Sequence, residues 1–377
     1  MITSEFSNVH IRGICCALPT KHIVNLDEYG ERFGVETVSK NSAMTGIYEG
    51  YMTSRYQTVS DLCFEAAKKL LNEKDISPSS IDILLFCSYN RDYVGPSTAY
   101  VLQHRLNLPL DCVTLDIPLG CSGFVYGMQV MGSLLSCSNA MRGLLLVGDS
   151  SSKCASPLDK SRMLFGDAGA AILVEKQENS PVMRFALRND GNRFRSIITP
   201  AGADRVVEGA SRERVLQEDE NIRSDYDMSI RGMDVFNFAI TDVPKLILEF
   251  MHYYEYQSED FDYLLLHQAN LFIIKHLAKK LKFPMSKVPI SLDRYANSSG
   301  TTIPVTICDT FGEKEPRHIH ALMSGFGVGL SWGVATIDFD TADVLPIFHT
   351  DEFYKEAVFY KQTAQTNQGV DTDEPEK

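Results

Sequence analysis

Residues 81–90 (IDILLFCSYN) decide how this sequence is organised, because residues 261–270 (FDYLLLHQAN) repeat their pattern at an offset of 180. Each stretch is a short apolar run that ends in polar residues, as is typical of a strand buried on both faces of a sheet. Two more pairs follow in the same order: residues 114–123 match 291–300 at an offset of 177, and 143–151 match 321–329 at an offset of 178. Three ordered pairs indicate an internal duplication, with chance similarity between apolar strands as the alternative.

The duplication predicts two similar α/β halves, residues 1–177 and 178–339, followed by an extension, residues 340–377. The strands alternate with helical patterns, such as those at 58–73 and 235–254, which favours buried, mostly parallel sheets with helices outside them.

Two segments depart from this alternation. Residues 196–230 are charged and irregular, and we expect them to form a surface loop or flap. In the extension, residues 353–360 (FYKEAVFY) fit one docked amphipathic helix, whereas residues 362–377 are polar and are expected to be disordered.

The bulk composition argues against several classes of protein. A formal net charge of −13 over 377 residues disfavours non-specific binding to nucleic acid or to an anionic membrane. The nine cysteines have neither CxxC nor zinc spacing, so we expect buried thiols, a reducing compartment and no metal. The N-terminus lacks the pattern of a signal peptide, and no segment approaches ~18 uninterrupted apolar residues, so we expect a cytoplasmic protein without a membrane span.

Cys121 stands between Gly120 and Ser122, after an expected strand and before an apolar segment that can form a helix. A sulfur at a helix N-terminus is expected to have a lowered pKa, which suits an acyl-accepting nucleophile. The residues alone leave a second interpretation open, in which Cys121 is a core cysteine beside packing glycines.

Two further polar residues follow expected strands. His267 ends the apolar run LLLHQAN, and Asn297 lies in RYANSSGTTIP, the segment that mirrors the one holding Cys121. Strand ends are where α/β proteins place reactive groups. Each residue alone fits a structural role, but the duplication would bring the three loops together at one cleft. The glycine-rich segment 324–333 has no P-loop lysine and fits a turn whose backbone amides hold an oxyanion.

Five motifs together resemble the β-ketoacyl-acyl-carrier-protein synthase III family of the thiolase superfamily. The motifs are GCSGF around Cys121, FGDAGAA (165–171), HQAN with His267, ANSSGTTIP with Asn297, and GFGVGLSWG (325–333). The resemblance implies a five-layered αβαβα fold made of two duplicated halves, and it covers about residues 8–339.

The resemblance also implies a mechanism without a cofactor or a metal. Cys121 would take an acyl group from a thioester, and His267 and Asn297 would stabilise the enolate formed when a malonyl-carrier thioester loses carbon dioxide. The amides of Cys121 and Val328 would form the other oxyanion hole. Transfer of the acyl group to an alcohol or amine is the first alternative, and a non-catalytic partner subunit of the same fold is the second.

The remaining expectations concern substrates and partners, namely an acyl-CoA or acyl-carrier thioester, an acyl carrier protein and a second copy of the chain. Where relatives grip coenzyme A with Trp and Arg, this chain has Lys40 and Met44, which makes a carrier-bound donor attractive; Lys160 replaces another arginine. Phe165 and Phe326 resemble aromatic residues that flank the acyl-cysteine. Gly95 stands where relatives close the acyl pocket across a homodimer with phenylalanine, which suggests room for a longer acyl group. The candidate carrier-docking residues are Lys275, Lys279 and Lys280.

Overall fold

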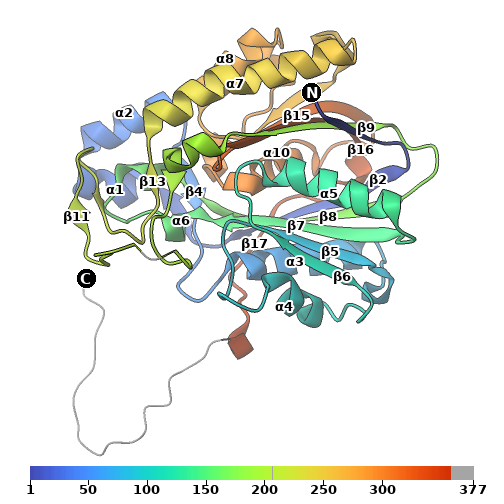
Figure 1. Cartoon of the computed structure of the whole chain (residues 1–377), viewed down its shortest axis with the longest axis horizontal. Helices are drawn as coiled ribbons and strands as arrows, with labels where there is room; N and C mark the ends of the chain where they lie inside the picture. The colour runs from blue at the N-terminus through green and yellow to red at the C-terminus, as the bar shows by residue number, and fades with distance from the viewer. Residues whose placement is uncertain (206, 358–377) are drawn as a thin grey trace, which may run out of the picture.

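The computed structural model of the protein describes residues 1–205 and 207–357, and its core is built from two sheets (Figure 1). The first sheet has the order β17-β2-β8-β7-β5-β6 and the second has the order β1-β9-β16-β15-β14. The strands of the first sheet are β17 (Phe348–Thr350), β2 (Val9–Pro19), β8 (Asp167–Lys176), β7 (Arg142–Ser150), β5 (Ile83–Cys87) and β6 (Val113–Ile117). Those of the second are β1 (Thr3–Phe6), β9 (Met183–Asn189), β16 (Ser331–Asp340), β15 (His318–Gly327) and β14 (Tyr263–Leu266).

The duplication is visible in how the strands pair. In the first sheet β2 and β7 both run antiparallel to β8, and β5 is parallel to β7. In the second sheet β9 and β15 both run antiparallel to β16, and β14 is parallel to β15. The repeated stretches 81–90 and 261–270 therefore occupy matching strands, β5 and β14.

The second repeated pair departs from this symmetry. Residues 114–117 belong to strand β6, but their counterpart begins with the short helix α9 (Leu292–Tyr295) and continues as a loop. Two strands also cross the predicted division of the chain at residue 177. Strand β1 pairs with β9 of the second sheet, and β17 of the extension pairs with β2 of the first.

The helices form three layers around the two sheets, which gives the αβαβα arrangement seen in Figure 1. Helices α5 (Gly123–Cys137) and α10 (Thr302–Phe311) lie between the sheets, α3 (Val59–Glu73) and α4 (Thr98–Arg105) cover the first sheet, and α7 (Gly232–Tyr253) and α8 (Leu271–Lys280) cover the second. Ile83 and Leu85 of β5 pack in the central layer, whereas Leu84 and Phe86 pack beneath α3 and α4. Full burial of each such side chain stabilises the fold by about 1.5–3 kcal/mol.

Helices α3 and α7 confirm the predicted helical stretches, with α7 continuing through Pro244. Thr58 and Asp61 form a capping box that fixes the start of α3. The smaller elements surround the end of the sheets that holds the site described below. They are β3 (His22–Val24), α1 (Asn25–Phe33), α2 (Val35–Thr45), β4 (Glu49–Tyr51) and α6 (Ser151–Cys154).

In its described residues the excursion 196–230 forms two short antiparallel strand pairs. Strands β10 (Ile197–Ile198) and β13 (Ser229–Ile230) pair at its base, and β11 (Val215–Leu216) pairs with β12 (Ile222–Arg223) between them. Arg223 is buried and forms an ion pair with Asp159 at 2.6 Å, which joins the excursion to the first half of the chain. This segment lies on the surface, as predicted, but strand pairing and the Arg223–Asp159 ion pair fix its position.

Up to residue 357 the extension docks without forming the helix predicted at 353–360, whose last three residues lie outside the described part of the chain. Strand β17 is followed by irregular chain and a short 3-10 turn at Lys355–Ala357, because the backbone of Tyr354 is held by Asp61 at 3.0 Å. The aromatic ring of Tyr354 lies 4.6 Å from the Arg105 guanidinium, whose other face lies 4.3 Å from the ring of Phe64. The predicted disordered tail falls outside the described residues. Within residues 1–205 and 207–357, no helix has the length and apolarity needed to cross a membrane.

Candidate active site

Cys121 lies in the turn between β6 and α5, two residues before the helix begins at Gly123. Loops from both halves approach it closely, and two glycines make the approach possible. A Cβ atom on Gly327 would lie 2.5 Å from the Cβ atom of Cys121, and one on Gly300 would lie 2.7 Å from the carbonyl oxygen of Gly120. Neither position leaves space for a side chain.

The loops enclose a cavity of about 180 Å³ that brings the three predicted catalytic residues together. Cys121, His267 and Asn297 all line it, as do Phe165, Phe326 and Val328. Ile197, Met228 and Ile230 of the excursion complete an apolar wall. Such a cavity with a few convergent polar groups is typical of a small-molecule site.

His267 directly follows β14 and is only 2% exposed. Its Nδ1 atom lies 2.7 Å from the Oγ1 atom of Thr302, and the Phe326 ring packs edge-on against the imidazole with centroids 5.3 Å apart. Burial lowers the pKa of His267 from 6.5 to about 4. The imidazole is therefore neutral near pH 7 and has one N–H to donate.

Asn297 is held so that its amide nitrogen is available. The backbone N–H of Ser299 donates to Oδ1 of Asn297 at 2.9 Å, and residues 165 and 297 form an isolated β-bridge. Because the oxygen is already engaged and no residue that the structure describes accepts from Nδ2, the Nδ2 hydrogens of Asn297 can be donated to a group in the cavity.

The predicted lowering of the Cys121 pKa is wrong. Burial raises the pKa of the Cys121 thiol, and this effect outweighs hydrogen bonds from the Ser299 hydroxyl, at 3.5 Å, and from the backbone amides of Val328 and Cys121 itself. The sulfur lies in a buried, largely apolar cavity, where a charged thiolate is disfavoured. The two amides nevertheless lie where a negative charge on or next to the sulfur would be stabilised.

The sequence did not single out three residues of this site: Ser299, Thr302 and Asp149. Ser299 and Thr302 belong to the quoted motif ANSSGTTIP, and Asp149 belongs to the third repeated pair. Their chemistry depends on contacts between the halves, such as the Gly300 amide on Asp149 at 3.3 Å, which no local pattern shows.

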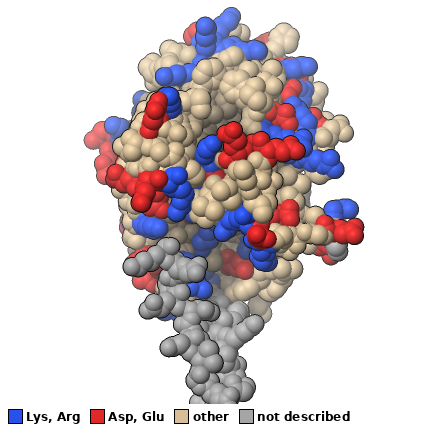
Figure 2. Space-filling view, turned by 90° about the vertical axis from the view of Figure 1, so that its left-hand side faces the viewer, with Lys and Arg blue, Asp and Glu red and all other residues tan. Residues whose placement is uncertain are grey.

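Two sets of predicted residues lie away from the cavity. Gly95 is exposed, with no atom within 4 Å of the position a Cβ would take, so it does not close this cavity within the described chain. Lys275, Lys279 and Lys280 are exposed on α8, whose residue Ile273 lines the cavity. On the face shown in Figure 2 the charges of both signs are interspersed, and Lys and Arg predominate at its upper end, where Figure 1 shows α7 and α8.

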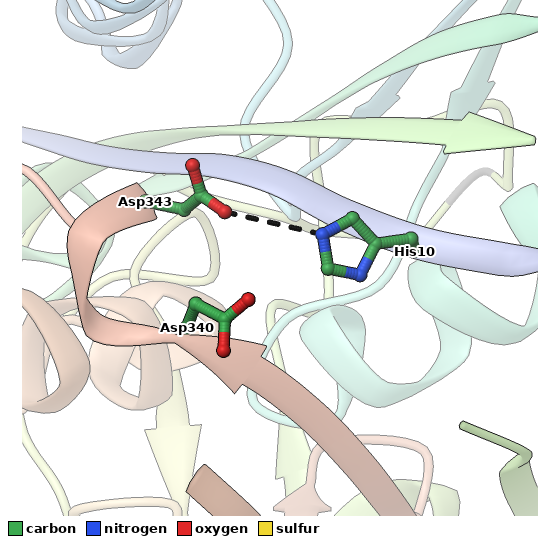
Figure 3. Close-up of side chains that lie close together, drawn as sticks. All are labelled: His10, Asp340 and Asp343. Atoms are coloured by element: carbon green, nitrogen blue, oxygen red, sulfur yellow. Dashed lines mark ion pairs between the residues drawn. The ribbon is translucent and has the colours of Figure 1, made fainter. Parts of the chain in front are cut away.

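One cluster outside the cavity has ligands of the kind that bind metals. His10, Asp340 and Asp343 lie together, with Nε2 of His10 3.9 Å from Asp343 (Figure 3). Asp343 is already paired with Arg12 at 2.6 Å and with Lys74 at 2.5 Å. Because Arg12 and Lys74 already neutralise the Asp343 carboxylate, we interpret the cluster as an ion-pair network and not as a metal site.

Comparison with known proteins agrees with this geometry. Residues 115–191 match the family described as 3-oxoacyl-[acyl-carrier-protein (ACP)] synthase III, and residues 251–339 match its C-terminal part. A β-ketoacyl-[acyl-carrier-protein] synthase III of Clostridium perfringens (strain ATCC 13124) is 31% identical over 296 residues, which cover 78% of this chain and 88% of that protein. A second, from Lactococcus lactis, is 31% identical over 299 residues, which cover 78% of this chain and 88% of that protein.

Solved structures agree as well. The crystal structure of a 3-oxoacyl-(acyl-carrier protein) synthase from Burkholderia xenovorans LB400 has a TM-score of 0.85 and 32% identity, covering 93% of this chain and 99% of that one. The fold and these relatives define a thiolase-like condensing enzyme, a kind of acyltransferase. The chain belongs to the 3-oxoacyl-[acyl-carrier-protein] synthase III family.

Proposed function

We propose that Cys121 accepts an acyl group from a thioester, and that the enzyme then joins this group to a malonyl-carrier thioester with loss of carbon dioxide. The observation that carries the proposal is the meeting of Cys121, His267 and Asn297 in one apolar cavity. No cofactor takes part in this scheme.

In the first step the Cys121 sulfur attacks the thioester carbonyl, and the carbonyl oxygen becomes an oxyanion. The backbone amides of Cys121 and Val328, which already face the sulfur, would donate to that oxygen. A preorganised donor of this kind typically contributes about 3 kcal/mol of transition-state stabilisation. Val328 acts through its backbone, so its side chain is not required.

In the second step the malonyl thioester carbonyl would accept hydrogen bonds from His267 and from Nδ2 of Asn297. Both donors are neutral and fixed, by Thr302 and Ser299 respectively. They would stabilise the enolate that forms as carbon dioxide leaves, and the apolar walls would disfavour the substrate's carboxylate. The enolate carbon then attacks the acyl-Cys121 carbonyl.

The acyl group would lie along the apolar wall that includes Phe165 and Met228. Strand β6 ends the first sheet with an edge that no described strand pairs with, and on it Val113 and Leu115 are 50% and 44% exposed. An exposed apolar edge invites pairing with another strand, which supports a homodimer formed along β6. Gly95 precedes α4, which packs on β6, so this dimer would bring Gly95 towards the partner's cavity.

An acyl carrier protein is the proposed partner. The exposed lysines Lys275, Lys279 and Lys280 lie on the helix whose first turns border the cavity, and positive charge there would complement an acidic carrier. Lys160 is also exposed, although it lies 4.0 Å from Glu220. The nine cysteines are all free thiols, which supports a reducing compartment such as the cytoplasm.

Intact-protein mass spectrometry tests the function directly. The full chain is mixed with a panel of acyl-CoA and acyl-carrier thioesters, and malonyl-carrier is then added. We expect an acyl mass on Cys121 that is discharged as a 3-oxoacyl-carrier product. A Cys121→Ala variant that still gains the acyl mass would contradict the assignment, and discharge to an alcohol or amine without carbon dioxide release would favour the transferase alternative.

A further inference from the structure

Asp149 is a buried carboxylate beneath the cavity that the proposed steps do not use. It lies at the end of β7 and is 1% exposed. Its oxygens accept hydrogen bonds from the backbone N–H of Tyr89 at 2.8 Å, the hydroxyl of Ser88 at 3.1 Å and the backbone N–H of Gly300 at 3.3 Å. The Ser299 hydroxyl has a single proton, which it can donate to the Cys121 sulfur or to this carboxylate. When it donates to Asp149, its oxygen can accept the thiol proton of Cys121.

Ser299 therefore stands between Asp149 and the reactive sulfur. Its Oγ atom lies 3.5 Å from Sγ of Cys121, and in the described part of the chain no other side chain hydrogen-bonds that sulfur. The backbone of Ser299 has a φ of +56°, a conformation that costs energy in a residue other than glycine and clusters at functional sites. The fold thus keeps the Ser299 hydroxyl beside the sulfur although this backbone conformation is energetically unfavourable.

We infer that Ser299 and Asp149 form a relay that removes the proton from Cys121 as the acyl group arrives. The S–H proton moves to Oγ of Ser299 while the Ser299 proton moves to the Asp149 carboxylate. The new bond joins Sγ of Cys121 to the acyl carbon, and the bond from that carbon to the donor's sulfur breaks. The proton then returns through Ser299 to the departing thiolate, so Asp149 ends ionised and no other reactant is consumed.

The electrostatics around the relay agree with this role. Cys121 needs a base because burial raises the pKa of its thiol. Burial, opposed by the hydrogen bonds from Ser299 and its neighbours, raises the pKa of Asp149 from 3.8 to about 6. The titratable groups that interact with Asp149 are the thiols of Cys63 on α3, Cys87 on β5, Cys121 and Cys154 on α6, and the pKa of each is raised. Near pH 7 Asp149 is therefore ionised and can accept a proton, as the relay requires. The departing thiolate is a stronger base than the Asp149 carboxylate, so the proton can pass on to it.

The test uses iodoacetamide as a probe of the sulfur, because alkylation needs thiolate but no thioester substrate. The rate of alkylation at Cys121 is measured by peptide mass mapping from about pH 5 to about pH 9, for the full chain and its variants. Ser299→Gly and Asp149→Asn remove the relay, and glycine suits the φ of residue 299, so that variant is expected to fold. Ser298→Ala is the matched control, since the Ser298 hydroxyl is buried without a hydrogen-bond partner among the described residues.

We expect the parent chain and Ser298→Ala to show a rise in rate through about pH 6, as Asp149 ionises. Ser299→Gly should lack that rise and react about 10²-fold more slowly at pH 7, a typical contribution of a positioned base. An unchanged profile in Ser299→Gly would overturn the relay, and loss of the rise in His267→Ala instead would make His267 the base.

This inference rests on the proposed acylation of Cys121, but the two can fail separately. If the alkylation profile shows the relay while no thioester loads Cys121 in the parent chain, the proposed function fails and the relay stands. If thioesters load Cys121 equally fast in the parent chain and in Ser299→Gly, the relay fails and the proposed function stands.

Discussion

The Oγ1 atom of Thr302 lies 2.7 Å from Nδ1 of His267 and 2.9 Å from the carbonyl oxygen of Ser299. Burial keeps the imidazole neutral, so it carries one proton, and Thr302 decides which nitrogen holds it. The Thr302 hydroxyl has a single proton, which it can donate either to the Ser299 carbonyl or to Nδ1 of His267. When it donates to Nδ1, the ring proton of His267 stays on Nε2. The proposed decarboxylation needs that donor, which makes Thr302 the residue that orients the chemistry of His267.

Replacing Thr302 by valine keeps the volume and removes the hydroxyl. We expect malonyl-carrier decarboxylation to slow about 10-fold, the equivalent of one buried hydrogen bond of ~1–1.5 kcal/mol. Alkylation of Cys121 should keep its rate, because that reaction does not use His267. The control is Thr306→Val, a buried threonine one turn later in α10. Equal losses in both assays would mean that Thr302 acts only on the fold.

Gly300→Ala tests whether the two halves must touch at Cys121. The new Cβ would lie 2.7 Å from the Gly120 carbonyl oxygen, so one loop has to move. We expect the free energy of unfolding, measured in urea, to fall by about 1–3 kcal/mol, and kcat to fall with it. Gly191→Ala, which adds a Cβ with no atom within 4 Å, should change neither. An active, equally stable Gly300→Ala enzyme would contradict the tight contact.

Reversing charge on α8 tests the docking surface. The double variant Lys279→Glu with Lys280→Glu should raise KM for the malonyl-carrier substrate, leave kcat unchanged and weaken the dependence of KM on salt. Lys21→Glu with Lys68→Glu makes the same change in net charge at other exposed positions and serves as the control. Docking on α8 would be refuted by equal effects of the two double variants.

The pKa of His267 predicts how stability depends on pH. The pKa of His267 in the folded protein, about 4, lies below the usual histidine pKa of 6.5, so the unfolded chain binds the extra proton first as pH falls. The contribution to stability is therefore fully present above pH 6.5 and is lost as pH falls towards 4, by about 3 kcal/mol in total. In urea titrations across this range, His267→Asn should lose less stability than the parent chain. Parallel curves would show that His267 titrates normally.

Much of this architecture was predictable from the sequence. The offset between residues 81–90 and 261–270 identified β5 and β14 correctly, because strands buried on both faces carry an unbroken apolar signal. The ordered motifs located Cys121, His267 and Asn297, which line one cavity. Helix α3 followed from the helical periodicity of its apolar residues.

The failures have a common physical cause, since each depends on contacts distant in sequence. The expected rise in Cys121 acidity considered only the local helix, whereas both halves bury the sulfur. The helix expected at residues 353–360 does not form where the structure describes it, because Asp61 holds the backbone of Tyr354. The polar segment after Ser291 forms a helix and a loop where its counterpart forms β6.

The exchange of strands between the sheets bears on how the chain is made. Strand β1 can pair only after β9 has been synthesised, and one edge of β2 stays unpaired until β17, near the other end of the chain, has been made. During synthesis the first half leaves the ribosome well before β17. Its sheet therefore lacks this edge strand until residue 350 has left the exit tunnel. A chain truncated before Phe348 would leave that edge of β2 unpaired, and we expect it to aggregate more readily than the full chain, as light scattering would measure.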